Sequence, residues 1–139
     1  MDAESVAVPS LTHLPKSNGG VISYAARDIG ERLQAKALVA FTQSGDTMER
    51  LARLHTELPL LAFTSVPAIR SQLALTWGTE TFLVPSVETT DEMINLVDSE
   101  LSKMPAFDHG DLVIVVAGSP PNTPGSTNLI RVHRIGEDD

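Results

Sequence analysis

The run DLVIVVA, residues 111–117, constrains the fold more than any other feature of the sequence, because it is apolar throughout after its first residue. A strand with one face in water alternates apolar and polar residues, whereas a strand buried on both faces reads as a continuous apolar run. The run therefore predicts a strand covered on both sides, as in parallel sheets flanked by helices. Shorter apolar runs predict further strands at residues 37–41, 60–63 and 81–84.

Helical periodicity occupies the segments around these strands. Before the first strand, four apolar residues recur at the spacing of one helical stripe, which we expect to pack on the sheet, with Val21 and Ala25 widening it. These four residues are Ile22, Ala26, Ile29 and Leu33.

Residue types that favour helix ends mark the starts of the other three helices. Ser44 is expected to cap the second helix, and Ser65 the third, with Pro67 near its first position. Thr89 and Glu92 have the spacing of a capping box for a fourth helix within residues 88–104.

The order of these elements, αβαβαβαββ, predicts an α/β fold with three layers, α/β/α. The last connection, GSPPNTPGSTN at residues 118–128, contains three prolines and cannot be a helix, whereas a parallel return normally needs a helical crossover. We therefore expect the last strand, 129–135, to be antiparallel and at or beside the edge of a five-stranded mixed sheet whose other four strands are parallel. Residues 1–18 lack periodicity and are interpreted as a linker or tail before one domain, residues 19–139.

The composition narrows the range of partners. A net charge of −8 disfavours nucleic acid and anionic lipid, and an aromatic content of 4% leaves few stacking surfaces. No apolar stretch approaches the roughly 18 residues of a membrane span, and the first 20 residues show neither the basic nor the apolar region of a secretory signal. The absence of cysteine excludes disulfides and thiolate metal sites. We expect a cytoplasmic protein that binds neither nucleic acid nor membrane.

Neither a metal site nor a catalytic site is predicted from the residues. The four histidines do not lie at metal-ligand spacing; they are His13, His55, His109 and His133. Ser44, Asp46 and His55 could suggest a hydrolase, but Ser44 and His55 would be about 16 Å apart along one helix, too far for a hydrogen bond.

A small polar loop follows the strand at 37–41, and it consists of Thr42, Gln43, Ser44, Gly45, Asp46 and Thr47. The unpaired N–H groups and positive dipole end of the following helix can hold an anion, the hydroxyls of Ser44 and Thr47 add donors, and Gly45 allows close approach. Ligands of open α/β sheets bind beyond the carboxyl ends of the strands, where this loop lies. An ordinary capped turn would have the same composition, and Asp46 itself complements the dipole, so the residues alone leave both interpretations open.

The connection at residues 118–128 also has two interpretations: a mobile hairpin loop, or a lid stiffened by its prolines. Long loops without secondary structure in compact domains are often functional. The residues that could face a ligand are Ser119, Asn122, Thr123, Gly125, Ser126 and Thr127.

Two of these segments resemble the C-terminal domain of pyruvate kinases. GDLVIVVAGSPPNTPGSTNLIRVHRIG, residues 110–136, is similar to the closing segment of that family, and ALVAFTQSGDT is similar to its strand followed by T-x-S-G-x-S/T. LLAFT and LTWGTETFLVP occur in matching order, so that the resemblance covers about residues 19–136. SYAARDIGERL and RVHRIGEDD resemble actinobacterial members.

The resemblance implies a regulatory role in glycolysis. It implies that residues 42–47 bind the phosphate of an allosteric effector and that residues 118–127 form the far side of that site. Phosphoryl transfer from phosphoenolpyruvate to ADP, with its Mg²⁺ and K⁺ ions, belongs in this family to a β/α barrel that 139 residues cannot contain, so no cofactor is expected in this chain. Asp46 replaces a basic residue of some members, and residues 118–128 contain no arginine. AMP or a hexose monophosphate is therefore favoured over fructose 1,6-bisphosphate.

Two functional hypotheses follow. The chain is either the regulatory domain of a pyruvate kinase, with the barrel in cis or in trans, or a freestanding phosphometabolite-binding or assembly module. In tetrameric members an equivalent domain packs across the first helices, which suggests a two-fold contact and a homodimer of this domain. The candidates are Tyr24, Arg27, Asp28 and Glu31; a solvated helix face is the alternative.

Overall fold

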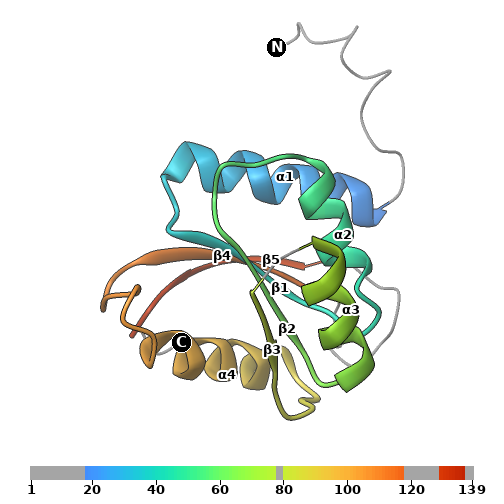
Figure 1. Ribbon diagram of the computed structural model, residues 1–139. Coiled ribbons are helices and arrows are strands. Elements are labelled where there is room, and N and C mark those ends of the chain that lie inside the picture. The colour runs from blue at the N-terminus through green and yellow to red at the C-terminus, as the bar shows by residue number, and fades with distance from the viewer. Residues whose placement is uncertain (1–17, 78–79, 118–128, 137–139) are drawn as a thin grey trace, which may run out of the picture.

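The computed structural model of the chain describes residues 18–77, 80–117 and 129–136 (Figure 1). Within these ranges the elements are α1 (Asn18–Leu33), β1 (Ala37–Phe41), α2 (Asp46–Arg53), β2 (Leu60–Thr64), α3 (Pro67–Trp77), β3 (Glu80–Leu83), α4 (Thr90–Ser102), β4 (Leu112–Ala117) and β5 (Leu129–Arg134). This order confirms the predicted alternation. Residues 1–17 of the expected linker lie outside the described residues.

The five strands form one mixed sheet in the order β3-β2-β1-β4-β5. Strands β1 to β4 are parallel to one another, and β5 pairs antiparallel with β4 at the edge of the sheet. The predicted fold class is confirmed, including the direction of the last strand.

Helices cover both faces of the sheet, with α1, α2 and α3 on one side and α4 on the other (Figure 1). Alternate residues of the central strands enter the two cores: Leu38 and Ile114 pack on the side of α1, and Val39 and Val115 on the side of α4. All four are fully buried. The apolar run in β4 thus has the double coverage that its sequence predicts.

The predicted face of α1 is wrong at its edges. Leu33 is 50% exposed and Val21 48%, whereas Ser23 and Gly30 are buried alongside Ala26. A Cβ at Gly30 would lie 2.9 Å from side-chain carbons of both Leu38 and Leu58. Ile22, Ala26 and Ile29 of the predicted stripe do pack on this core, and the helix also approaches β1 through its small residues.

The helix caps agree only in part with the predictions. The capping box of α4 is confirmed, with Glu92 N–H donating to Thr89 Oγ1 at 3.1 Å. Ser44 does not cap α2, because the N-cap position is Gly45 in a left-handed conformation (φ 90°). Helix α3 begins at Pro67 as expected, but the carbonyl that accepts its first helical bond, from Arg70 N–H, belongs to Val66 and not to Ser65.

Two helix ends carry a residue other than glycine in the left-handed region. Gln34, after α1, has φ 56°, and His55, after α2, has φ 53°. Around Gln34 the N–H of Ala35 donates to Gly30 O at 2.9 Å, which is the 6→1 bond of a Schellman ending. Glycine is the usual residue there because a Cβ is disfavoured at positive φ.

We therefore expect Gln34→Gly to raise the free energy of unfolding by about 0.5–1 kcal/mol. The same change at Gln72, exposed inside α3, should lower it by about 1 kcal/mol, because glycine is a poor helix former. Urea unfolding of the two variants measures both. Equal destabilisation by the two substitutions would contradict a strained ending at Gln34.

Candidate functional site

The polar loop 42–47 lies at the point where the sheet changes its winding direction. From β1 the chain proceeds to β2 on one side, while β4 flanks β1 on the other. The register pairs Phe41 with both Phe63 and Ala117, so that the loop and the segment after β4 leave the sheet from adjacent strand ends. Ligands of open α/β sheets bind at such a switch point.

The loop is held by bonds of its own. Thr42 N–H donates to Phe63 O at 2.9 Å and so extends the β1–β2 ladder by one residue. Thr42 Oγ1, buried, accepts from Gly45 N–H at 2.9 Å. The predicted donor set is therefore smaller by one, because the Gly45 N–H already has an acceptor inside the protein.

Gly45 sets the start of α2. Its carbonyl accepts from Glu49 N–H at 3.0 Å, the first helical bond. A Cβ at Gly45 would have room, at 3.5 Å from Leu73 and 3.7 Å from Ile69 of α3, so the requirement for glycine here comes from the positive φ. Thr47, one residue inside the helix, is buried, whereas Ser44 is partly exposed.

Gln43 is hydrogen-bonded to Ser65, a residue outside the predicted site. Ser65 Oγ donates to Gln43 Oε1 at 3.1 Å across 22 residues of chain. Nε2 of Gln43 is buried and has no hydrogen-bond partner among the described residues. The only sequence signal for Ser65 is its position directly after β2, at the same edge of the sheet as Gln43.

Part of the predicted site lies outside what the structure describes. This applies to the side chain of Asp46 and to Ser119, Asn122, Thr123, Gly125, Ser126 and Thr127. The two ends of their segment are placed, since Ala117 of β4 pairs with Leu129 of β5.

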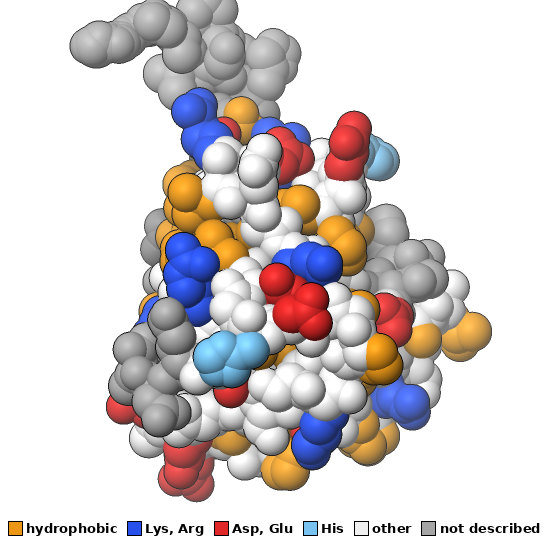
Figure 2. Space-filling model, turned by 90° about the vertical axis from the view of Figure 1, so that its left-hand side faces the viewer, with side chains coloured by type: hydrophobic (Ala, Val, Ile, Leu, Met, Phe, Trp, Pro, Cys, Tyr) orange, Lys and Arg blue, Asp and Glu red, His pale blue; other side chains and the backbone are white. Residues whose placement is uncertain are grey.

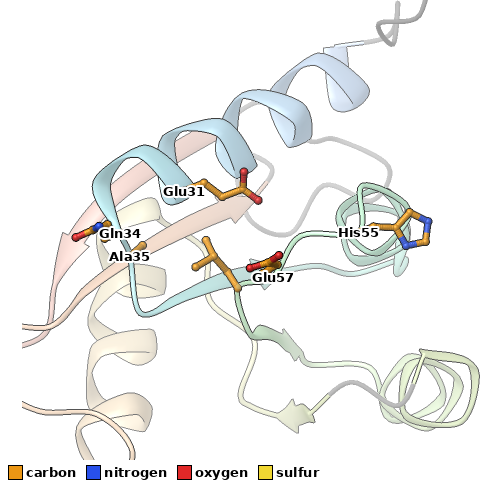
Figure 3. Close-up of a pocket in the computed structure, with 6 residues that line it drawn as sticks. Glu31, Gln34, Ala35, His55 and Glu57 are labelled. Atoms are coloured by element: carbon orange, nitrogen blue, oxygen red, sulfur yellow. The ribbon is translucent and has the colours of Figure 1, made fainter.

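A pocket of about 660 Å³ lies at the opposite end of the sheet, between the ends of α1 and α2 (Figure 3). It is lined by Glu31, Gln34, Ala35, His55, Glu57 and Leu58. His55 points away from the other lining residues in this view (Figure 3). Two carboxylates make the pocket unsuited to a phosphate.

The surface at that end of the sheet mixes both signs of charge (Figure 2). No group of three His, Cys, Asp or Glu residues that could hold a metal ion occurs in the described ranges. The candidate for an anion site therefore remains the loop 42–47.

The four residues proposed for a two-fold contact all have partners within the chain. Arg27 Nη1 donates to Leu54 O at the end of α2 (3.2 Å), and its guanidinium lies 4.8 Å from the ring centre of Tyr24. Asp28 accepts from Arg32 at 3.0 Å, and Glu31 accepts from Thr56 Oγ1 at 3.0 Å. A cation at the carboxyl end of a helix complements its dipole, so Arg27 stabilises the docking of α2 on α1.

A mixed sheet with helices on both faces and a polar loop at its switch point defines an α/β domain of the doubly wound kind. Residues 21–133 match the family model described as "Pyruvate kinase, alpha/beta domain". The chain belongs to the pyruvate kinase family, within its C-terminal α/β domain.

The relatives agree with this assignment. A pyruvate kinase of Mycobacterium tuberculosis is 68% identical over 139 residues, which are all of this chain and 29% of that protein. One from Corynebacterium efficiens is 61% identical over 131 residues, 94% of this chain and 28% of the relative. The actinobacterial resemblance is confirmed. The chain thus spans less than a third of these relatives.

A solved structure shares the fold. A pyruvate kinase from Cryptosporidium parvum matches with a TM-score of 0.76 at 20% identity, over 94% of this chain and 26% of that one. In the described ranges no helix is both long and apolar enough to cross a membrane.

We expect Gly45→Ala to lower the free energy of unfolding by about 1–2 kcal/mol, because alanine is strained at this φ. Gly110→Ala is the matched control, since Gly110 has a φ of 95° and an added Cβ there would meet nothing within 4 Å. The two losses, measured by urea unfolding, should be similar. A much larger loss at Gly45 would show that contact with α3, and not the backbone, requires glycine there.

Proposed function

We propose that this chain is the regulatory domain of a pyruvate kinase and that residues 42–47 bind the phosphate of a small metabolite. The observation that carries the proposal is the position of the loop. In a chain of this family, a T-x-S-G-x-T segment lies at the switch point of the sheet and leads into the N-terminus of α2.

The local chemistry supports an anion at this position. The first N–H groups of a helix have no acceptor within the helix and lie at its positive end. Thr42 closes the turn through its bond to Gly45, which leaves the loop preshaped before a ligand arrives. Ala117, which precedes residues 118–127, pairs with Phe41 at the start of the loop, and the proposal includes residues 118–127 as the far side of the site.

The charges support a ligand with a single phosphate. Neither residues 42–47 nor residues 118–128 contain lysine or arginine, and Asp46 adds a negative charge. A second phosphate would need basic partners that these two segments do not supply. AMP or a hexose 6-phosphate fits this set of neutral donors better than fructose 1,6-bisphosphate.

The proposal extends to the assembly that the domain serves. The chain would act with a catalytic β/α barrel, in cis or in trans, in a cytoplasmic glycolytic enzyme that forms pyruvate and ATP from phosphoenolpyruvate and ADP. The Mg²⁺ and K⁺ of that reaction would belong to the barrel, as the resemblance to the family implies.

The ligand proposal predicts a thermal shift. A ligand at one hundred times its Kd stabilises the fold by about 2.7 kcal/mol. Millimolar glucose 6-phosphate or AMP should raise the Tm of this chain more than fructose 1,6-bisphosphate does.

Gly45→Ala and Gly110→Ala together test whether the thermal shift depends on the loop 42–47. The shift should be reduced in Gly45→Ala and in Ser44→Ala, and it should persist in Gly110→Ala, which has the same backbone strain at the far end of the sheet. A Tm that none of the three compounds changes would contradict a phosphate site in this chain.

The isolated chain is expected to have no pyruvate kinase activity, because the barrel residues that perform the reaction are absent from it. A coupled assay with Mg²⁺ and K⁺ measures this. Turnover that co-purifies with the polypeptide through two unrelated chromatographic steps would overturn the prediction.

We further propose that α1 contributes a two-fold contact between copies of the domain. Tyr24 and Val21 are exposed on it, beside Asp28 and Glu31. A two-fold contact is self-complementary, so that Arg27 of one copy can meet Asp28 or Glu31 of the other. Such exposed ion pairs contribute only about 0–1 kcal/mol each.

A weak, salt-sensitive dimer is therefore expected in sedimentation velocity at high protein concentration. Tyr24→Glu should weaken it, whereas Gln72→Glu on the exposed side of α3 should not. Arg27 is unsuitable as a probe because it also binds Leu54 O. A monomer at every concentration in low salt, or a dimer that Tyr24→Glu leaves unchanged, would rule out this contact.

A further inference from the structure

The hydrogen bond between Gln43 and Ser65 joins the carboxyl ends of two neighbouring parallel strands. Gln43 lies two residues beyond the end of β1, and Ser65 directly follows β2. The backbone around both is fixed, since Thr42 N–H donates to Phe63 O at 2.9 Å and Val66 N–H donates to Thr64 Oγ1 at 3.2 Å. These backbone bonds place Gln43 and Ser65 so that their side chains form a hydrogen bond of 3.1 Å.

The two ends of the Gln43 amide are in different situations. Oε1 accepts the Ser65 hydroxyl, while Nε2 is buried without a partner among the described residues. A buried donor without an acceptor costs free energy, and buried polar groups in native proteins nearly always have a partner. Arg27 Nε and His133 Nδ1 are also buried without a partner among the described residues, but only Gln43 lies in the loop 42–47, where an acceptor on a bound ligand would satisfy Nε2.

We propose that Ser65 is a positioning residue of the phosphate site: by donating to Oε1 it holds the Gln43 amide with Nε2 as a donor to a phosphoryl oxygen. This inference rests on the proposed function of residues 42–47. It adds Ser65 as the residue that determines whether the Gln43 amide presents its donor or its acceptor to the ligand.

The chemistry of the amide explains why the orientation matters. An amide rotated by 180° would present Oε1, an acceptor, to a group whose oxygens are also acceptors. Serine can supply a proton to Oε1 and so fix the useful orientation, whereas alanine cannot. Ser65 is joined to the site through Gln43 and not through the ligand, so its loss would weaken binding by releasing the amide.

The experiment titrates this 139-residue chain with glucose 6-phosphate, AMP and inorganic phosphate, one probe at a time. It follows the side-chain N–H signals of Gln43 by NMR and determines Kd from the titration. The variants are Ser65→Ala, Ser65→Thr as the conservative replacement, and Ser71→Ala as a control on the exposed surface of α3. The Tm of each variant without ligand is recorded as well.

In the wild-type chain we expect the Gln43 side-chain signals to shift on titration. Ser65→Ala should raise Kd about tenfold, the effect of one lost hydrogen bond to a charged group. Its Tm without ligand should change little. Ser65→Thr should restore binding, and Ser71→Ala should match the wild type.

The outcomes separate this inference from the proposed function. If the chain binds a probe but Ser65→Ala binds it equally well, or the Gln43 side-chain signals do not move, Ser65 has no positioning role and the phosphate site stands. If Ser65→Ala lowers the Tm without ligand and leaves Kd unchanged, the bond is only structural. If no probe binds to the wild type, the phosphate site and this inference both fail.

Discussion

Burial of β1 and β4 on both faces is the constraint on which the rest of the structure depends. Neither strand has a polar face, so helices must cover both sides of the sheet. The chain meets this requirement by placing α1, α2 and α3 on one face of the sheet. Helix α4, which connects β3 to β4, covers the other face. That connection returns β4 to the free edge of β1 and creates the switch point at their carboxyl ends. The position of the candidate site is thus a consequence of how the core is covered.

The two ends of the sheet differ in character. At the amino ends of the parallel strands, side chains tie elements together: Asp98 Oδ1 lies 2.8 Å from His133 Nε2 and accepts from Gly136 N–H at 2.7 Å, which fixes the end of β5 against α4. At the carboxyl ends, the polar groups belong to turns that lead into helices, and one of them, Gln43 Nε2, lacks a partner among the described residues. His133 Nδ1, at the amino ends, is also buried without a partner among these residues, so the location of Gln43 beside the loop 42–47 is what distinguishes its Nε2.

The sheet could be predicted from the sequence because its signals are local. The strand at 37–41 was predicted with the bounds that the structure shows, and a turn of three prolines gave the direction of β5. The face of α1 could not be predicted in the same way. Leu33 and Val21 were expected to pack because they are large and apolar, but Gly30 lets the helix sit close to Leu38, and only the three-dimensional structure shows that approach.

For the candidate site, too, one part could be predicted from the sequence and another could not. Its location after β1 followed from the order of elements, whereas its internal bonds did not. Ser44 was expected to cap α2 because serine is a common cap, but the left-handed Gly45 and its bond to Thr42 take that position. The contact of Gln43 with Ser65 spans 22 residues and leaves no pattern in the sequence. The residues expected in 118–128 remain predictions.

The net charge of −8 makes these local bonds decisive for the proposed ligand. Long-range attraction cannot bring an anion to this chain, and residues 42–47 contain no cation to hold one. Binding would rest on donors at hydrogen-bond distance: N–H groups at the start of α2, hydroxyls, and the amide of Gln43. Such donors act only when their orientation is fixed beforehand, because a freely rotating hydroxyl or amide can present a lone pair as easily as a proton. The hydrogen bond from Gly45 to Thr42 holds the backbone of the loop, and the one from Ser65 to Gln43 holds the amide in one orientation.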